Sequence, residues 1–110
     1  MNNEQIIADL QATKDQMTPE NWNPSGCMDG DKRCVLMHLR QVTVDADRSQ
    51  TTPEARARYT EAGDALSLHI PFVTEPNYML VGNYNDRSYT TFADIQALID
   101  KTLADLGGLG

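Results

Sequence analysis

Basic residues, cysteine and long apolar runs are all scarce in this 110-residue sequence, and each scarcity excludes a class of function. Nine lysines and arginines stand against 16 acidic residues, which gives a net charge of −7. Phosphate binding needs a basic surface that releases counterions, so nucleic acid is not expected as a direct ligand. No stretch approaches the roughly 18 apolar residues of a membrane helix, so we expect no membrane contact.

An export signal is also missing from the N-terminal segment. Residues 1–17 carry three acidic side chains and no apolar core, which is unlike a secretory signal. We therefore expect a cytoplasmic protein. With 40% apolar residues the chain can form a small core, and its length predicts one globular domain over residues 1–110.

Metal-ligating residues are few. The two cysteines, Cys27 and Cys34, cannot complete a four-ligand zinc site, and structural disulfides are rare in a reducing cytosol. A site that also uses His38 and His69 is conceivable because His38 follows Cys34 at helical spacing, but idle thiols and ordinary histidines are the preferred interpretation. The segment 29–31 resembles the start of a calcium loop but lacks its closing Glu. We predict no metal and no cofactor.

Helical periodicity is the dominant pattern that is present. Apolar residues repeat at helical spacing in four segments, at about residues 3–17, 31–42, 52–68 and 91–106. The second helix is expected to use Asp31 as its N-cap, and the third to use Thr52. Gly63 either weakens the third helix or permits a close helix approach. In the last helix, Thr91 and Asp94 form a capping-box pattern.

The remaining segments predict loops and a little β-structure. Residues 18–30 are punctuated by proline and glycine, and residues 42–50 fit a short strand or a connector. The region 71–86 is irregular, with a β-prone stretch at 78–81 followed by a turn-rich stretch at 82–86. The predicted fold is therefore mainly α, a compact bundle of about four helices with at most a small two-stranded β patch.

Three polar or aromatic residues in the loops are candidates for contacts. Trp22 is either an anchor that folds its loop onto the core, with its indole N–H bonded to a carbonyl, or a hot spot for a partner. Asn85 and Asp86 are either turn residues that hold the Trp22 loop or the Cys34 helix, or contacts to a ligand or partner. We predict partner binding through Trp22, Asn85 and Asp86, and structural anchoring by Cys34, Thr91 and Asp94.

The order of these landmarks resembles a family of small uncharacterised proteins from actinobacteria, proteobacteria and their phages. Its members have a loop Trp, a helix that opens with Cys, an Asn-Asp pair and a Thr-capped closing helix. The closing helix matches best, at Thr91, Asp94, Ile95, Leu98, Ile99 and Asp100. One departure is the segment 36–38, where the family has a small Gly-Ala pair. The resemblance implies a helical fold and a phage or mobile-element origin, but no activity.

One enzymatic interpretation centres on Cys34. In the first turn of a helix, the helix dipole and free backbone N–H groups would lower the pKa of its thiol. His69 as base and Asn83 or Asn85 as orienting residue would then follow the papain-like order. The chain shows few strands to carry the histidine, and the local motifs of those enzymes are missing. We expect no catalytic residue.

Charge leaves two binding interpretations open. The acidic residues are scattered, and residues 32–42 carry a charge of +3, so the acidic surface is interrupted. We expect a non-enzymatic protein that binds a host or phage protein. The alternative is an acidic inhibitor that mimics DNA towards a nucleic-acid-binding or defence system. A spare apolar helix stripe also makes a homo-oligomer conceivable.

Overall fold

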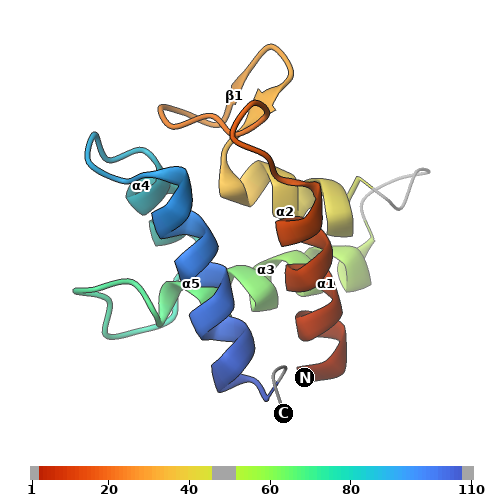
Figure 1. Cartoon of the computed structure of the whole chain (residues 1–110). Helices are drawn as coiled ribbons and strands as arrows, with labels where there is room; N and C mark the ends of the chain where they lie inside the picture. Colours follow the sequence, from red (N-terminus) through yellow and green to blue (C-terminus); the bar gives the residue numbers. More distant parts are fainter. Residues whose placement is uncertain (1–2, 46–51, 108–110) are drawn as a thin grey trace.

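The computed structural model describes residues 3–45 and 52–107, and five helices occur in these parts of the chain (Figure 1). In chain order, the elements are α1 (Asn3–Gln16), β1 (Met28–Asp29), β2 (Lys32–Arg33), α2 (Val35–Thr43), α3 (Pro53–Ser67), α4 (Met79–Asn85) and α5 (Phe92–Asp105). The strands β1 and β2 pair antiparallel, with Met28 opposite Arg33. The predicted mainly α fold with a small two-stranded patch is confirmed.

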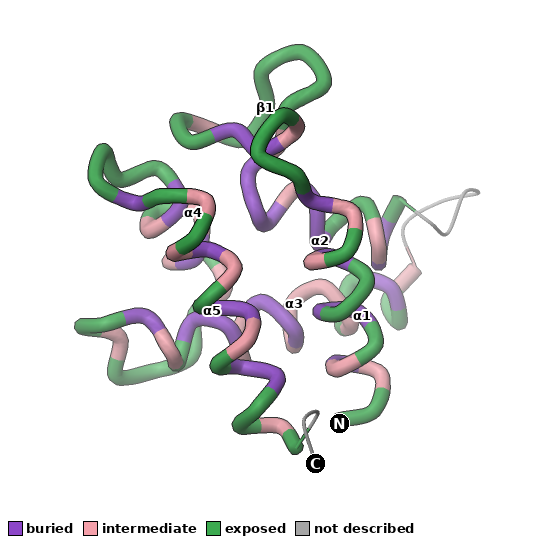
Figure 2. Tube along the Cα trace, in the orientation of Figure 1, coloured by how far each residue is buried: buried purple, intermediate pink, exposed green. Residues whose placement is uncertain are grey.

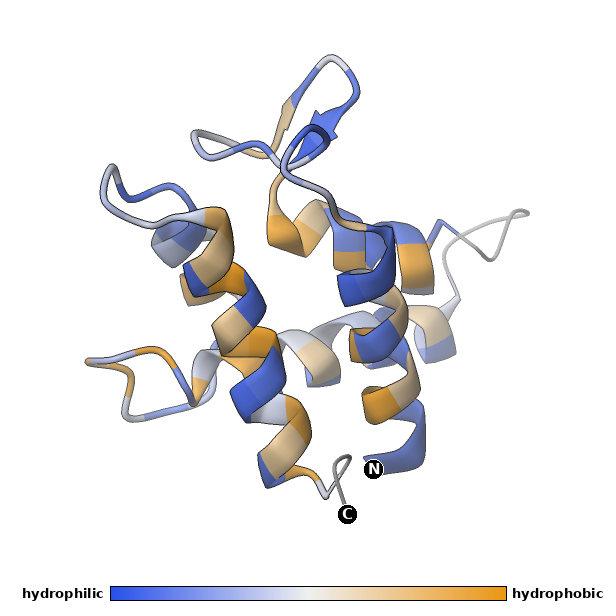
Figure 3. Ribbon diagram, viewed as in Figure 1, coloured by the Kyte–Doolittle hydropathy of each residue, from blue (hydrophilic) through white to orange (hydrophobic). Residues whose placement is uncertain are grey.

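The helices surround one apolar core. α1 contacts α2, α3 and α5, while the short α4 contacts α2 and α3. Buried and apolar segments of the helices recur on the sides that face one another, whereas the β1–β2 hairpin is mostly exposed (Figures 2 and 3). The most deeply buried apolar side chains come from all five helices and include Leu10, Val35, Leu39, Leu66, Val81, Ile95 and Ile99.

Two of the predicted helix starts are confirmed by their caps. The Thr52 side chain accepts a hydrogen bond from the backbone N–H of Ala55 at 3.1 Å, and Pro53 occupies the first turn. At α5, the Thr91 side chain accepts from the N–H of Asp94 at 3.1 Å, and Asp94 accepts from the N–H of Thr91 at 2.9 Å. This reciprocal pair is the predicted capping box, which fits the predicted role of Thr91 and Asp94 as structural anchors.

The predicted start of the second helix is wrong. Asp31 is not the N-cap, because Lys32 and Arg33 pair with β1 and helix α2 begins only after Cys34. Gly30 turns the hairpin with a φ of 62°, a left-handed conformation that suits glycine. The backbone N–H of Cys34 then donates to the carbonyl of Cys27 at 2.9 Å, which extends the hairpin up to the helix.

The predicted irregular region over residues 71–86 contains α4 instead of a β-prone stretch. The cause is tertiary contact with α3. A Cβ atom at Gly63 would lie 2.5 Å from the Cβ of Tyr78, so only glycine lets the start of α4 come this close. The Asp64 carboxylate also accepts a hydrogen bond from the Tyr78 N–H at 2.8 Å. The close-approach interpretation of Gly63 is therefore confirmed.

A partly buried ion pair joins α1 to α3. The Arg58 guanidinium donates to both carboxylate oxygens of Asp9, at 2.7 and 3.1 Å, and the Asp9 side chain is only 3% exposed.

The expected connector at 42–50 lies partly outside the described residues. None of the helices in the described ranges is both long and apolar enough to cross a membrane.

Candidate functional site

Asn85, at the end of α4, is a fully buried polar residue that joins three parts of the chain. Its Oδ1 accepts hydrogen bonds from the indole N–H of Trp22 at 2.7 Å and from the backbone N–H of Val35 at 3.0 Å. Its Nδ2 donates to the backbone carbonyl of Asn23 at 2.8 Å. One side chain therefore fixes the Trp22 loop and the first residue of α2 relative to α4.

Through its bond to the N–H of Val35, the Asn85 side chain caps the N-terminus of α2 from a distant part of the chain. Cys34 occupies the N-cap position, but its side chain makes no capping hydrogen bond. The Asn85 amide oxygen, which lies 50 residues further along the chain, satisfies the first backbone N–H of the helix instead. Helix α2 thus depends on a tertiary contact for its start.

Asp86 and the ring of Trp22 complete this arrangement. The Asp86 carboxylate accepts from the backbone N–H of Gly26 at 2.9 Å and from Nδ2 of Asn85 at 3.2 Å. The Trp22 ring packs on Phe92 with a centroid distance of 5.9 Å. These contacts agree with the anchoring interpretation of Trp22, Asn85 and Asp86. Partner binding through them stays a prediction; in this fold Trp22 and Asn85 are buried against each other.

Cys34 does not have the environment of an activated thiol. Its side chain is 1% exposed, and burial raises the pKa of the thiol to about 11, although backbone N–H groups of Met37 and Leu36 act in the opposite direction. The expectation of a lowered pKa is therefore wrong, because desolvation outweighs the helix N-terminus. Buried at the junction of hairpin and helix, Cys34 fits the predicted role of a structural anchor.

The other members of the papain-like set lie in unrelated contacts. Nε2 of His69 is 3.5 Å from Oδ2 of Asp105, near the C-terminal end of α5. Asn85 is occupied by Trp22, Val35 and Asn23, and no hydrogen bond within the described ranges joins the Cys34 thiol to His69 or Asn83. Both cysteines are free thiols, and no group of three potential metal ligands occurs among the residues that the structure describes.

His38 is buried in a hydrogen-bonded position on α2. Its Nδ1 lies 2.8 Å from Nε2 of Gln16, and its Nε2 lies 3.0 Å from the carbonyl oxygen of Asn21. The amide nitrogen of Gln16 can only donate and the carbonyl oxygen of Asn21 can only accept, so the network assigns the neutral tautomer of His38 that is protonated at Nε2. Burial lowers the pKa of His38, which favours this neutral form.

An exposed cluster that the sequence did not predict joins the segment before α4 to the segment after it. It consists of Phe72, Arg87 and Tyr89, and we call it the aromatic surface. The guanidinium carbon of Arg87 is 5.6 Å from the Phe72 ring centroid and 6.0 Å from that of Tyr89, and Nη1 donates to the Tyr89 hydroxyl at 2.7 Å. Phe72 is 83% exposed and Tyr89 is 65% exposed.

The backbone of Phe72 is in the left-handed region, with a φ of 83°, and it is the one non-glycine residue of the described ranges with a positive φ. This conformation is unfavourable for a bulky aromatic residue. The sequence carries no local signal of this cluster, because Phe72 and Arg87 lie on opposite sides of α4 in the sequence and only the fold brings them into contact.

Taken together, these features define a small, mainly α protein with a buried, hydrogen-bonded asparagine and an exposed aromatic cluster. The model of the family of unknown function DUF6197 matches residues 1–105, and the chain belongs to this family. The predicted resemblance to a family without known function is thereby confirmed. Neither the curated proteins nor the solved structures yield a significant match.

Proposed function

We propose that this protein acts without catalysis, by binding another protein through the aromatic surface, with Phe72 inserting into an apolar pocket of the partner. The observation that carries this proposal is Phe72 itself. It presents a large apolar ring that is 83% exposed, on a backbone in the left-handed region. Strained residues of this kind concentrate at functional positions.

The folded chain gains little from Phe72 in return for this conformation. A left-handed backbone costs a non-glycine residue about 1–2 kcal/mol. The contact with Arg87 offsets about 0.5–1 kcal/mol of this at an exposed site. Burial of the ring against a partner would supply the missing stabilisation, about 1.5–3 kcal/mol for a fully buried Phe.

The composition of the aromatic surface supports the same proposal. Tyrosine and arginine are enriched among the residues that dominate binding energy at protein interfaces. Arg87 is held between Phe72 and Tyr89, so its side chain is already ordered before binding, which reduces the entropic cost of association. A host or phage protein as the partner, and a phage or mobile-element origin, stay predictions.

The DNA-mimic alternative has weaker support, because many acidic side chains serve the fold. Such carboxylates pair with a cation or accept a backbone N–H, as in Asp9 with Arg58, Asp100 with Lys14, Asp64 with Tyr78 and Asp86 with Gly26. A mimic needs a dense row of free acids that a basic groove can neutralise. The Cys34 enzyme is likewise poorly supported, because its thiol is buried and its pKa is raised.

Comparative affinity capture from host cells tests the proposal. Wild type, Phe72→Gly and Arg87→Gln are used as baits, with Lys101→Gln as a control that makes the same charge change at an exposed residue outside the aromatic surface. We expect one protein to be retained by wild type and control and lost by both aromatic-surface variants, and its purified form to bind directly with the same ranking. A partner retained equally by all four baits would refute the proposal.

Self-association is a separate outcome of the same experiment. Sedimentation velocity of the purified wild type and of Phe72→Gly shows whether a second copy of the chain occupies the aromatic surface. We expect both proteins to sediment as monomers. A wild-type dimer that Phe72→Gly converts to a monomer would overturn the proposal of a different partner protein.

A further inference from the structure

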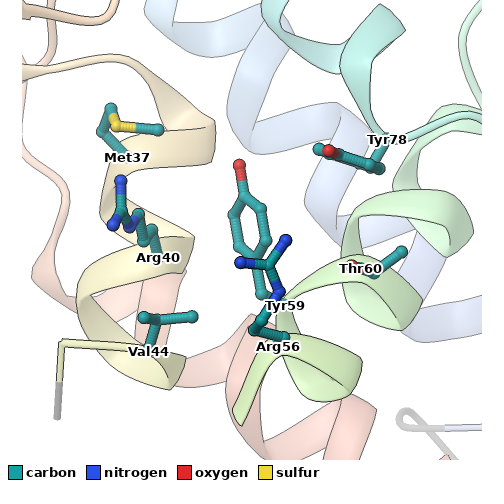
Figure 4. Close-up of a pocket in the computed structure, with 7 residues that line it drawn as sticks. All are labelled: Met37, Arg40, Val44, Arg56, Tyr59, Thr60 and Tyr78. Atoms are coloured by element: carbon teal, nitrogen blue, oxygen red, sulfur yellow. The ribbon is translucent and has the colours of Figure 1, made fainter. Parts of the chain in front are cut away.

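A pocket of about 270 Å³ lies between α2 and α3, away from the aromatic surface (Figure 4). Arg40 and Met37 line it from α2, and Arg56 and Tyr59 line it from α3. Tyr78, which precedes α4, also lines it. Figure 4 shows the Tyr59 ring standing between the two helices, with the arginine side chains around it.

The charge of this pocket is opposite to that of the chain. The sequence carries 16 acidic residues, yet the lining residues that the structure describes include two arginines and no carboxylate. Two guanidinium groups on neighbouring helices repel one another unless an anion lies between them. An anion is therefore the natural complement of the pocket.

Both guanidinium groups are available to a ligand. The side chain of Arg56 makes no hydrogen bond or ion pair with any other residue in the described parts of the chain. Arg40 has one ion pair, between its Nε and Oδ1 of Asp45, but the distance is 3.7 Å and both side chains are about half exposed. An exposed pair with this geometry contributes little, so it does not compete strongly with a bound anion.

Two tyrosine hydroxyls add neutral donors. Tyr59 and Tyr78 pack edge to face with ring centroids 5.4 Å apart, which fixes both rings at the pocket. Burial raises the pKa of Tyr59 to about 12, with smaller contributions from Tyr78 and others, so its hydroxyl stays protonated at neutral pH. Neither hydroxyl has a hydrogen-bond partner among the residues that the structure describes.

We propose that this pocket binds a small organic phosphate, whose phosphoryl oxygens lie between Arg40 and Arg56 and whose organic group packs against Met37. The guanidinium fork matches phosphate geometry and forms charge-assisted bonds. A phosphate monoester offers three unesterified oxygens and nearly two charges, which fits two guanidinium groups and a phenol better than a carboxylate does. This site is separate from the protein-binding function proposed above.

Isothermal titration calorimetry with phenyl phosphate, inorganic phosphate and benzoate tests the proposal on the full chain. We expect phenyl phosphate to bind tightest, because its phosphoryl oxygens contact both arginines while its ring packs against Met37. Arg56→Gln should weaken phenyl phosphate at least tenfold, and Tyr59→Phe should weaken it less. Lys101→Gln, which makes the same charge change at an exposed residue outside the pocket, should change the affinity less than twofold.

Circular dichroism establishes that each variant is folded before it is titrated. Phenyl phosphate that fails to bind at millimolar concentration would overturn the proposal, as would equal affinity of wild type and Arg56→Gln. Benzoate that binds as tightly as phenyl phosphate would overturn the phosphate assignment. Arg40→Gln provides a second variant on the opposite helix, and it should also weaken phenyl phosphate at least tenfold.

Discussion

Replacement of Asn85 by alanine is expected to destabilise the fold more than its size suggests. The change removes four hydrogen bonds, and three of the losses leave the indole N–H of Trp22, the N–H of Val35 and the carbonyl of Asn23 without this partner. A buried polar group without a partner costs about 1–3 kcal/mol. Since water and local relaxation will recover part of this cost, we expect a loss of roughly 3–5 kcal/mol, a large fraction of the about 5–15 kcal/mol that stabilises a typical domain.

Urea unfolding measures this loss directly. Trp22 is the only tryptophan, so its fluorescence reports on the environment that Asn85 maintains, and far-ultraviolet circular dichroism reports on the helices. Asn83→Ala is a matched control, because Asn83 lies on the same helix and is exposed. We expect that control to change the free energy of unfolding by less than about 0.5 kcal/mol.

A double-mutant cycle separates the Trp22 bond from the rest. Trp22→Phe removes the indole donor and should cost less in the Asn85→Ala background than in the wild type, because the bond of 2.7 Å is already lost there. This cycle is followed by circular dichroism alone. An Asn85→Ala loss below about 1 kcal/mol, or additive losses in the cycle, would refute the view that Asn85 organises the fold.

Three further predictions follow from single side chains. Burial lowers the pKa of His38, so the unfolded chain binds more protons than the folded chain just below pH 6.5. The free energy of unfolding should therefore fall as the pH drops from 6.5 towards the lowered pKa, by at most about 1.4 kcal/mol per pH unit. Chemical unfolding at several pH values should show this component in the wild type and not in His38→Gln. Native protein should react with iodoacetamide at the exposed Cys27 and not at the buried Cys34 until denaturant is added, which mass spectrometry of the alkylated peptides detects; native labelling of Cys34 would contradict its burial. Gly63→Ala should lower the free energy of unfolding by about 1–3 kcal/mol despite the higher helix propensity of alanine, because the new Cβ would lie 2.5 Å from that of Tyr78; a more stable variant in a thermal melt would contradict the close packing.

The elements that the sequence predicted correctly are those with local signals. Thr52 and the Thr91–Asp94 capping box predict the starts of their helices, because each threonine accepts a hydrogen bond from the backbone N–H only three residues further along the chain. The contact between Asn85 and the Trp22 loop was one of two interpretations of those residues. Local chemistry alone is enough to propose such contacts, but only the fold selects among them.

The missed elements depend on residues far apart in the sequence. Helix α4 begins where Gly63 and Asp64 of α3 meet Tyr78, so its own β-prone residues mislead a local interpretation. The hairpin has only two residues in each strand, too few for an alternating pattern. The contact of Phe72 with Arg87 spans the whole of α4, so sequence spacing could not predict it.

The affinity of Phe72→Gly for the captured partner protein tests the proposed function most directly. Glycine accepts the left-handed backbone without strain, so the free energy of unfolding of this variant should differ from that of the wild type by less than about 1 kcal/mol. Its affinity should nevertheless fall at least tenfold, as expected when an aromatic hot spot is removed. Unchanged affinity in a variant that is as stable as the wild type would contradict protein binding through the aromatic surface.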